Sequence, residues 1–308
     1  MLITLRLRNF RCYPTLNWDI PAEGALLYGS NAQGKTSLLE AICFALTLHT
    51  PRTARMDRLA MHGCNDFGIS LDTDNGTRKL IWQQRRLEMS VAGETRRDYT
   101  DFLADAGPVV WLGNTDMNLV TGGAEERRAY LDFLGSQWHP AYRPALLEYR
   151  KALKSRNLLL RNPRHTAATL RSYAGLLGRY GEVLCTLRAQ LLQLLRPHIC
   201  QHHLAISGGN EEVSIVYHPS TELPLEQALE QALEADERAG FTTVGPHRDD
   251  FELYIKGRSA AEYASEGQQR TLATSLVLAQ SGLLQVQTGH SPTLLIDDIF
   301  GGLDPARR

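Results

Sequence analysis

The chain has 308 residues and a formal net charge of −1, with 33 lysines and arginines against 34 acidic residues. Hydrophobic residues make up 43% and charged residues 22%, which is typical of a globular chain of one large or two modest domains. These totals alone indicate neither a nucleic-acid binder nor a membrane protein. No apolar run reaches the roughly 18 residues that a membrane-spanning helix needs. We therefore expect no membrane contact.

Charge is unevenly distributed along the chain. Residues 143–196 contain eleven lysines and arginines and two acids, whereas residues 211–237 contain eight acids and no base. The five cysteines are far apart and form no C-x-x-C pair, so we expect reduced thiols in a cytosolic protein rather than a disulfide framework or a zinc site.

The first part of the chain is predicted to be mostly strands with one early helix. Alternation of apolar and polar residues, short apolar runs and the turn-forming pair Asn75-Gly76 indicate strands and a hairpin. The expected strands are 2–10, 15–20, 24–29, the two arms of 67–84, and 85–91, and the expected helix is 35–48.

The middle of the chain changes to helical periodicity, and the last part alternates strands and helices. We expect helices within 141–160 and 169–195, interrupted at Pro163 and Pro197. Further along, strands are expected at 213–218, 249–255 and 292–297, and helices at 223–240, ending at Gly240, and 267–285.

The segment GSNAQGKT, residues 29–36, matches the P-loop pattern G-x-x-x-x-G-K-[ST]. An apolar run precedes it and a helix follows, as the motif requires. Backbone N–H groups of such a loop surround phosphate oxygens, Lys35 reaches the β- and γ-phosphates, and the Thr36 hydroxyl binds Mg²⁺. We therefore predict ATP and Mg²⁺ as cofactors. The predicted nucleotide-binding residues here are Gly29, Ser30, Asn31, Ala32, Gln33, Gly34, Lys35, Thr36 and Ser37.

The segment TLLIDD, residues 293–298, supplies the acids that P-loop enzymes place at the end of a buried strand. Asp297 is predicted to support Mg²⁺ together with Thr36, and Asp298 to orient or deprotonate an attacking water. Alone this pattern is weak, because many strands end in aspartate and a helix N-cap explains it equally well. Together with the P-loop, the pattern is a strong indication of a Mg²⁺-supporting aspartate.

A third motif, SEGQQ at residues 265–269, opens a predicted helix. Ser265 and Gly267 at a helix N-terminus favour an anion site, although an ordinary N-cap is the simpler interpretation. The order P-loop, S-x-G-Q, Asp-Asp and then Asp304 resembles ABC-type ATPases. That resemblance implies an ATP-sandwich homodimer, in which Ser265, Gly267 and Gln268 contact the ATP of the other subunit and Asp304 crosses the interface.

Four segments resemble the RecF family, within the SMC-like branch that begins with a strand and Asn9-Phe10-Arg11. They are VTGGAEERRAYLD (120–132), KSRNLLLR (154–161), TTVGPHRDDFEL (242–253) and ASEGQQRTLATSLVLAQ (264–280). The resemblance spans the chain. It implies an α/β ABC-type P-loop ATPase head, with a mixed sheet and an antiparallel β-subdomain, and an inserted all-helical lobe. The expected domains are an N-terminal ATPase half, 1–122, a helical insert, 123–200, and a C-terminal half, 201–308.

The resemblance also implies a function in DNA repair and replication. An ATP-driven dimer would clamp double-stranded DNA near single-strand gaps, at junctions of single- and double-stranded DNA, and help load RecA together with RecO and RecR. Weak, slow, DNA-stimulated ATP hydrolysis would reset the clamp in the cytoplasm, at the nucleoid. The basic helical insert is expected to contact DNA phosphates, with a solvated helical face as the alternative. Arg11 is expected either to touch the nucleotide base or ribose or to cap a strand.

Some residues depart from the family pattern. Ala124 stands where the first signature usually has proline, and Gly301-Gly302 precedes Leu303-Asp304. RecF chains continue past this point with a strand, a γ-phosphate-sensing switch residue and a closing helix. We therefore expect the C-terminal end of the core to be missing, or to be supplied by a partner.

Several alternatives remain open. The chain could be an ATP-binding DNA scaffold without turnover, or another SMC-like ATPase such as an overcoming-lysogenization-type nuclease, although no room is left for a nuclease domain. A P-loop small-molecule kinase would have no use for SEGQQ. His247 is expected either to form part of a structural turn or to have a role at the γ-phosphate or at the interface. Arg127 and Arg128 either bind phosphate or pair with Asp132 and Glu125 on one helix.

Overall fold

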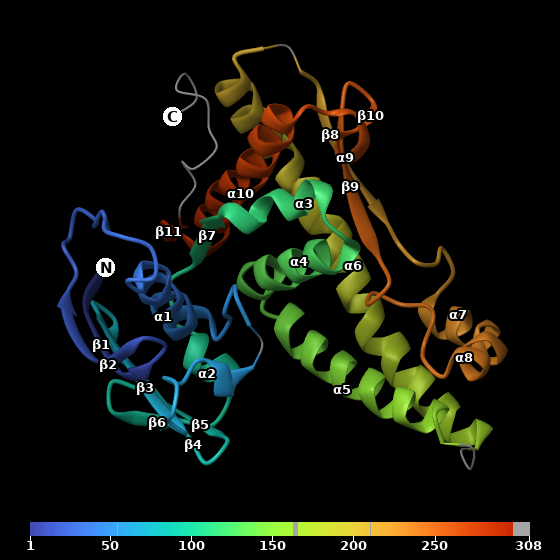
Figure 1. Ribbon diagram of the computed structural model, residues 1–308. Helices are drawn as coiled ribbons and strands as arrows, with labels where there is room; N and C mark the ends of the chain where they lie inside the picture. Colours follow the sequence, from blue (N-terminus) through green and yellow to red (C-terminus); the bar gives the residue numbers. More distant parts are fainter. Residues whose placement is uncertain (54, 163–165, 210, 298–308) are drawn as a thin grey trace. The chain divides into compact units, whose positions relative to one another are not determined.

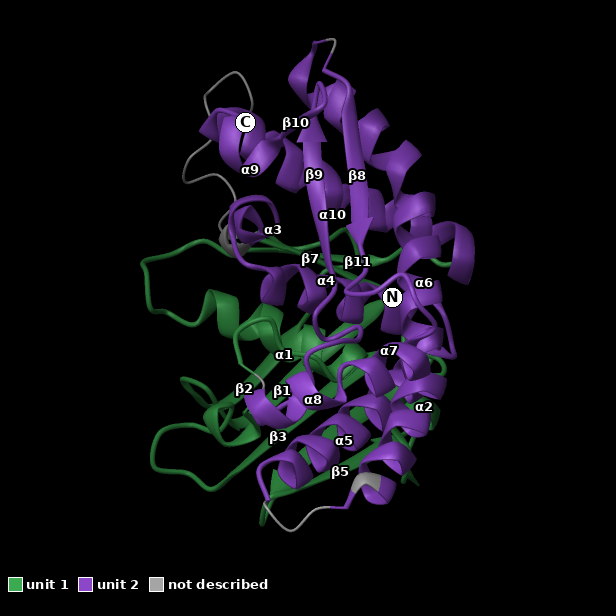
Figure 2. Cartoon of the chain, turned by 90° about the vertical axis from the view of Figure 1, so that its right-hand side faces the viewer, with its two compact units in different colours: residues 1–113, 290–299 green, residues 114–289, 300–308 purple. Residues whose placement is uncertain are grey.

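The computed structural model describes residues 1–53, 55–162, 166–209 and 211–297 (Figure 1). Contacts between residues divide the described chain into two compact units, which Figure 2 colours separately. Unit 1 contains residues 1–113 and 290–297, and unit 2 contains residues 114–289. The divisions therefore follow residues 113 and 289, whereas the sequence suggested domain boundaries at 122 and 200. Each unit is described by itself.

Unit 1 is built around a six-stranded antiparallel sheet with the order β2-β1-β3-β4-β5-β6. Its inner face is apolar because alternate residues of each strand point the same way. In β1, for example, Leu5 and Leu7 are buried while Arg6 and Arg8 are exposed. The strands are β1 Leu2–Phe10, β2 Tyr13–Asp19, β3 Asp66–Thr73, β4 Gly76–Gln83, β5 Arg86–Val91 and β6 Glu94–Arg96.

The hairpin expected around Asn75-Gly76 is confirmed, with its turn one residue earlier. Thr73 pairs with Gly76, so the two loop residues are Asp74 and Asn75. Beneath the sheet, the ring of Phe67 stacks on Trp82 at 5.7 Å and meets the edge of Phe10 at 5.6 Å, centroid to centroid. These aromatic contacts form the core on which the first helix packs.

That helix, α1 (Lys35–Thr47), is buried from Ser37 to its end except at Leu39, and it contacts β1, β3 and β4. It confirms the expected helix over 35–48. Unit 1 also contains a parallel pair of strands, β7 (Val109–Gly113) and β11 (Thr293–Asp297), in continuous register from Thr293 opposite Val109. Smaller elements of this unit are η1 Met56–Arg58 and α2 Tyr99–Leu103.

The strand expected at 24–29 is wrong: no strand is assigned there in the described structure. Leu26 and Tyr28 are 85% and 90% exposed. An apolar run forms a strand only where a neighbouring strand accepts its hydrogen bonds, and none of the described strands pairs with this segment. The run is also flanked by Gly24 and Gly29, whose φ angles of +106° and +147° suit turns rather than strands.

Unit 2 is dominated by long helices, as the sequence predicted. The helix α6 (Ala167–Ser207) packs against both α5 (Tyr142–Leu160) and α10 (Glu266–Thr288), and α4 (Ala124–Trp138) contacts all three (Figure 1). The expected interruption at Pro197 is wrong, because α6 continues through it to Ser207. An interior proline costs about 3 kcal/mol through its missing hydrogen bond, and the packing of α6 on two helices offsets that cost.

A three-stranded antiparallel sheet, in the order β10-β9-β8, completes unit 2. Its strands are β8 Val213–His218, β9 Asp250–Ile255 and β10 Arg258–Ser259. The single helix expected over 223–240 is two helices, which meet at Ala232, the C-cap of the first and the N-cap of the second. Gly240 ends the second one in a left-handed conformation, as predicted. The remaining helices are α7 Leu225–Gln231, α8 Leu233–Ala239, η2 Asn114–Met117, α3 Asn118–Thr121 and α9 Ala260–Tyr263.

A buried ion pair connects the basic and acidic blocks of the sequence. The guanidinium of Arg156 lies 2.6 Å from the carboxylate of Asp236, and the two side chains are 1% and 0% exposed. Arg156 also donates to the Thr242 hydroxyl at 2.8 Å, and Asp236 accepts from the backbone and hydroxyl of Thr243. Part of the basic block is therefore structural.

The variant Arg156→Met should lower the free energy of unfolding by about 3 kcal/mol, because it leaves a buried carboxylate without its cation. The control Lys154→Met removes an exposed cation from the same helix and should change it by no more than about 0.5 kcal/mol. Urea denaturation followed by circular dichroism measures both. Equal effects of the two substitutions would contradict a structural role for the buried pair.

Candidate functional site

The P-loop, residues 29–36, leads directly into the N-terminus of α1. Ala32 and Gly34 adopt positive φ angles of +64° and +93°, which turn the backbone of the loop before the helix begins. The Lys35 ammonium lies across the loop and donates to the carbonyls of Gly29 and Ser30 at 2.7 and 2.8 Å. Backbone N–H groups at the start of a helix and a lysine at the same place form a phosphate-binding arrangement.

Gly34 is required at its position for two reasons. Its φ of +93° is unfavourable for residues with a Cβ atom. A Cβ atom there would also lie 2.5 Å from the Cys12 sulfur and 2.7 Å from the Tyr13 hydroxyl. Tyr13 in turn donates to the carbonyl of Gln33 at 3.4 Å. Cys12 and Tyr13, which follow β1, thus pack against the P-loop at Gln33 and Gly34.

The Thr36 hydroxyl donates to the carboxylate of Asp297 at 2.8 Å, across 261 positions of sequence. Thr36 is at the start of α1, and Asp297 ends β11, which contacts that helix. Mg²⁺ prefers oxygen ligands such as hydroxyls and carboxylates, so the side chains of these two residues fit the predicted ion. No cluster of three or more His, Cys, Asp or Glu side chains suited to a metal occurs among the described residues. Asp298 and Asp304 lie outside the described residues.

Arg11 makes its contacts with protein atoms next to the P-loop helix. Its Nε and one terminal nitrogen donate to the two oxygens of Glu40 at 2.8 and 2.6 Å, and the other donates to the carbonyl of Arg58 at 2.7 Å. Glu40 is on α1 and is fully buried. Arg11 therefore compensates a buried carboxylate on the helix that carries the P-loop. Its contact with the nucleotide stays a prediction.

The SEGQQ motif forms the N-terminus of α10 in unit 2. The Ser265 hydroxyl accepts from the backbone N–H of Gln268, and the Gln268 side-chain oxygen accepts from the backbone N–H of Ser265. This reciprocal arrangement is a capping box, so the interpretation of Ser265 as an N-cap is confirmed. Ser265 and Gly267 are exposed. Whether they also contact nucleotide stays a prediction.

A carboxylate that the sequence analysis did not single out fixes Gln268. Glu211 accepts from the Gln268 amide nitrogen at 2.7 Å and contacts Nε2 of His203, near the end of α6, at 2.9 Å. These hydrogen bonds, first from Gln268 and then from His203, lower the pKa of Glu211. The cluster joins α6 to the first turn of α10. No sequence signal connects positions 203, 211 and 268, because their proximity depends on tertiary packing.

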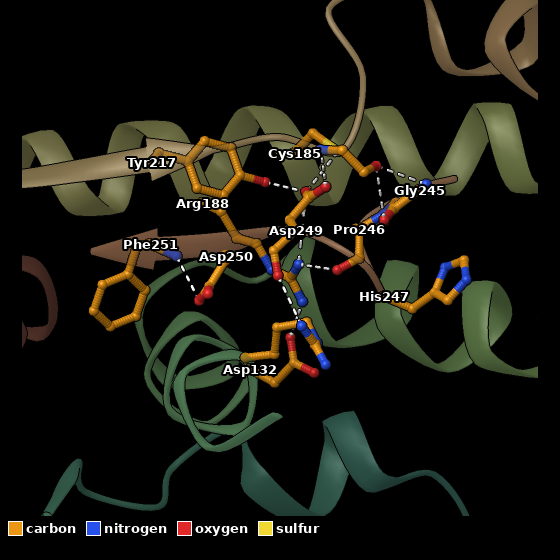
Figure 3. A network of polar contacts seen from close by, with 12 residues as sticks. Asp132, Cys185, Arg188, Tyr217, Gly245, Pro246, His247, Asp249, Asp250 and Phe251 are labelled. Atoms are coloured by element: carbon orange, nitrogen blue, oxygen red, sulfur yellow. Dashed lines mark hydrogen bonds and ion pairs between the residues drawn. The ribbon is translucent and has the colours of Figure 1, made fainter. Parts of the chain in front are cut away.

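The GPHRDD segment, residues 245–250, is the centre of a buried polar network (Figure 3). Asp249 is 1% exposed and accepts from the Tyr217 hydroxyl and, at 2.7 Å, from the backbone N–H of Ser220. The thiol of Cys185 lies 3.5 Å from the same carboxylate. Burial, followed by the nearby Asp249 charge, raises the pKa of the Cys185 thiol to about 12. These contacts hold α6 against β8 and the start of β9.

Arg188, on α6, balances the acidic charge of this network. It is 2% exposed, 2.8 Å from Asp132 and 3.9 Å from Asp249, and it donates to the Pro246 carbonyl at 2.6 Å. Its Nε donates to the Tyr142 hydroxyl at 2.9 Å, which in turn donates to Asp132 at 2.7 Å. Each nitrogen of this buried guanidinium thus has a partner, which is the condition for burying a charge.

His247 has a structural role in the network. Its Nδ1 lies 2.6 Å from the Tyr149 hydroxyl and its Nε2 lies 3.0 Å from the Thr242 carbonyl. The carbonyl only accepts, so Nε2 carries the proton and Nδ1 accepts from Tyr149. Burial lowers the pKa of His247 to about 4, so the ring is neutral at pH 7. A neutral ring with both nitrogens occupied favours the structural turn over a γ-phosphate contact.

Of the two alternatives for Arg127 and Arg128, the pairing with Asp132 and Glu125 on one helix is wrong for Asp132. Arg127 instead binds both carboxylate oxygens of Asp250 at 2.7 Å, and Arg128 donates to the Asp249 carbonyl at 2.9 Å. Asp132 pairs with Arg150 and Arg188. The spacing of Arg128 and Asp132 allows an ion pair along one helix. Both arginines instead bind partners on a distant segment, and these contacts are partly buried, which strengthens them.

Comparisons with known proteins agree with this architecture. A model described as "AAA domain" matches residues 4–100. A protein of Synechococcus sp. (strain JA-3-3Ab), "DNA replication and repair protein RecF", is 35% identical over 99% of this chain and 85% of its own length. The protein of that description from Moorella thermoacetica is 34% identical over 99% of this chain and 84% of its own.

Solved structures give the same result. "Structure of the recombination mediator protein RecF-ATP in RecFOR pathway" has a TM-score of 0.91 and 28% identity, covering 99% of this chain and 87% of that one. "Crystal structure of the SmcHead bound to the C-winged helix domain of ScpA" has a TM-score of 0.51 at 12% identity, covering 99% of this chain and 90% of that one, which shows the fold alone.

The fold and the site therefore define an ABC-type P-loop ATPase head with an inserted helical lobe, confirming the predicted fold class. Its P-loop and the strand ending in Asp297 lie together in one unit. Within that class the chain belongs to the RecF family of DNA replication and repair proteins, as the sequence resemblance indicated. None of the described helices is long and apolar enough to cross a membrane.

The variant Gly34→Ala should weaken ATP binding by about tenfold or more, because it introduces both left-handed strain and a collision with Cys12 and Tyr13. Gly24→Ala is the matched control, since Gly24 also has a positive φ but a Cβ atom there meets nothing within 4 Å. Titration with a fluorescent ATP analogue measures both. If the two variants lose affinity equally, strain alone explains the effect and the close approach does not matter.

Proposed function

We propose that this protein is an ATP-binding DNA repair and replication factor that dimerises on ATP and clamps double-stranded DNA near single-strand gaps. The observation that carries the proposal is the 2.8 Å hydrogen bond between Thr36 and Asp297, in a chain of the RecF family. This contact joins the end of the P-loop to the strand-borne acid that P-loop ATPases use. The RecF structure with ATP supports ATP as the ligand.

Each predicted site residue of the P-loop and of the Asp297-Asp298 pair has a role that follows from its chemistry. Lys35 neutralises the β- and γ-phosphates, and the P-loop N–H groups hold their oxygens. The Thr36 hydroxyl and the Asp297 carboxylate would hold Mg²⁺, which would supply positive charge against the phosphates. Asp298 orients the attacking water, and slow hydrolysis resets the protein.

The signature residues act on a second copy. Ser265, Gly267 and Gln268 complete the site around ATP held by the partner's P-loop, and Asp304 crosses the interface. Support comes from unit 2, where the first turn of α10 is exposed and held in place by its capping box. The protein works in the cytoplasm, at the nucleoid, with RecO and RecR in loading RecA. A solved structure similar to this chain is named as part of the RecFOR pathway.

ATP with Mg²⁺ should double the mass of the full chain in light scattering, because each site needs both copies. Lys35→Ala should abolish the change, whereas Lys79→Ala, an exposed lysine on β4, should not affect it. Phosphate release is measured alongside: dimers without turnover would indicate an ATP-binding scaffold instead. A chain that binds ATP and stays monomeric would contradict the sandwich and favour a kinase-like monomer.

The DNA-binding surface proposed here is a stripe that consists of Lys151 and Lys154 on α5 and Arg161, the C-cap residue of that helix. The three are exposed, and their positions place them on one face of the helix. Lys151 has one weak ion pair, 4.0 Å from Glu148. Other cations of the basic block, Arg156 and Arg188, are buried in ion pairs and do not reach DNA.

Replacing Lys151, Lys154 and Arg161 together with glutamine should weaken binding to gapped duplex DNA uniformly across sequences. The slope of log affinity against log salt should fall by up to about 3, since each phosphate contact contributes about 0.9. Fluorescence anisotropy at several salt concentrations measures it. The control replaces Lys79, Arg85 and Arg86, three exposed cations of unit 1. Equal losses in both variants would contradict a specific α5 surface.

A further inference from the structure

One arginine of the GPHRDD segment faces away from the buried network, and none of the roles above uses it. Arg248 is exposed, whereas its neighbours in the chain are anchored: Asp249 is 1% exposed, and both ring nitrogens of His247 have partners. The backbone N–H of Arg248 also donates to the carbonyl of Gly245 at 2.8 Å. The network therefore fixes the point at which this side chain emerges from unit 2.

The Arg248 side chain is held against an aromatic ring. Its guanidinium carbon lies 4.8 Å from the centroid of the Phe241 ring, and Phe241 is itself 37% exposed. A contact of this kind holds a guanidinium in place without neutralising its charge. Within the described part of the chain, the Arg248 side chain forms no hydrogen bond or ion pair. Its planar surface and its N–H donors are therefore available to a ligand.

The Phe241–Arg248 pair adjoins the end of the α5 stripe. A Cβ atom at Gly240, the C-cap of α8, would lie 3.9 Å from Cγ of Arg161, the last cation of the stripe. Figure 2 shows α8 beside α5. Leu158 lies between Lys154 and Arg161 on the same face and is 60% exposed. Cations, an exposed aliphatic side chain and an aromatic ring thus follow one another along one surface of unit 2.

The surface charge changes sign beyond Arg161. Helices α7 and α8 belong to the acidic block, and their side chains Glu226, Glu230 and Glu234 are exposed. Continued duplex, which carries a phosphate about every 1.7 Å of its axis, would be repelled there. An unpaired base carries no charge and has two flat faces, so it suits a ring and a guanidinium better than a phosphate does. Charge thus favours duplex along α5 and an unpaired base at its end.

We propose that Phe241 and Arg248 form a stacking platform for an unpaired DNA base next to the end of a duplex, while Lys151, Lys154 and Arg161 hold the duplex phosphates. The inference rests on the proposed DNA-binding function, and it names the feature of gapped DNA that the protein recognises. The guanidinium of Arg248 stacks on the base, and the Phe241 ring supports it from the other side. Gapped DNA binds more tightly than blunt duplex because only gapped DNA supplies both parts.

Two DNA probes isolate the contribution of the base. One is a gapped duplex, and the other is the same duplex with abasic residues at the gap nucleotides next to the duplex ends. Fluorescence anisotropy with ATPγS and Mg²⁺ gives the dissociation constant of each. The original chain should bind the gapped duplex about tenfold more tightly than the abasic one, because stacking on a base is lost. Phe241→Leu and Arg248→Gln should each remove most of this difference.

Conservative variants separate stacking from charge. Arg248→Lys keeps the charge but loses the planar guanidinium, so it should behave like Arg248→Gln, whereas Phe241→Tyr keeps the ring and should behave like the original chain. Arg179→Gln is the matched control, because Arg179 is an exposed arginine of unit 2 that lies 5.5 Å from the centroid of the Tyr180 ring. It should leave the ratio of the two affinities unchanged. Thermal melting should show that all variants are folded, since each replaces an exposed side chain.

The inference is overturned if the original chain binds the gapped and the abasic duplex equally. It is also overturned if Arg248→Lys keeps the difference, because the side chain then acts as a charge on phosphate. The same holds if Phe241→Leu keeps it, because the exposed ring then serves another partner. In these cases the proposed function stands as long as the original chain binds duplex DNA. A chain that binds neither probe contradicts the proposed function and this inference together.

Discussion

The parallel pairing of β7 with β11 is the constraint on which the rest of the molecule depends. Parallel neighbours cannot be joined by a tight turn, so the chain must leave the end of one strand and return to the start of the other. Here that crossover contains residues 114–289, the whole described part of unit 2. The register places Asp297 opposite Gly113 and within hydrogen-bonding distance of Thr36. The P-loop and Asp297, the two halves of the candidate nucleotide site, therefore meet only if the entire inserted unit returns the chain to this strand.

Unit 2 achieves a defined structure largely through buried charge. Arg188 and Asp249 are 2% and 1% exposed, and leaving either one unpaired in the interior would be strongly destabilising. Their partners come from α4, α5, α6 and the strands, so the network is satisfied only in one arrangement of these elements. This explains why the GPHRDD segment is rich in polar residues although only Arg248 in it is exposed. Its chemistry is directed inward, at other parts of the fold.

Local signals predicted well where the cause is local. The P-loop, the helix after it, the hairpin near Asn75 and the N-cap at Ser265 all follow from residues within a few positions of each other. Predictions from the sequence were wrong where the structure depends on contacts with residues far away along the chain. Pro197 lies inside a helix because α5 and α10 support α6, and residues 24–29 form no strand because no described strand accepts their hydrogen bonds. Asp250, the carboxylate partner of Arg127, is 123 positions away, and a single sequence carries no signal that selects Asp250 over Asp132.

The two halves of the proposed sandwich differ in how they are held. The P-loop is exposed and contains residues with positive φ. In the first turn of α10, by contrast, both polar atoms of the Gln268 side chain are bonded. Its oxygen accepts from the Ser265 N–H and its nitrogen donates to Glu211. Glu211 is itself tied to His203 of α6, a helix packed along two others. The rotational freedom of Gln268 is therefore already lost when unit 2 folds. Association with a second copy would therefore cost less side-chain conformational entropy at this surface. A larger part of the energy of weak contacts with a nucleotide would then contribute to binding.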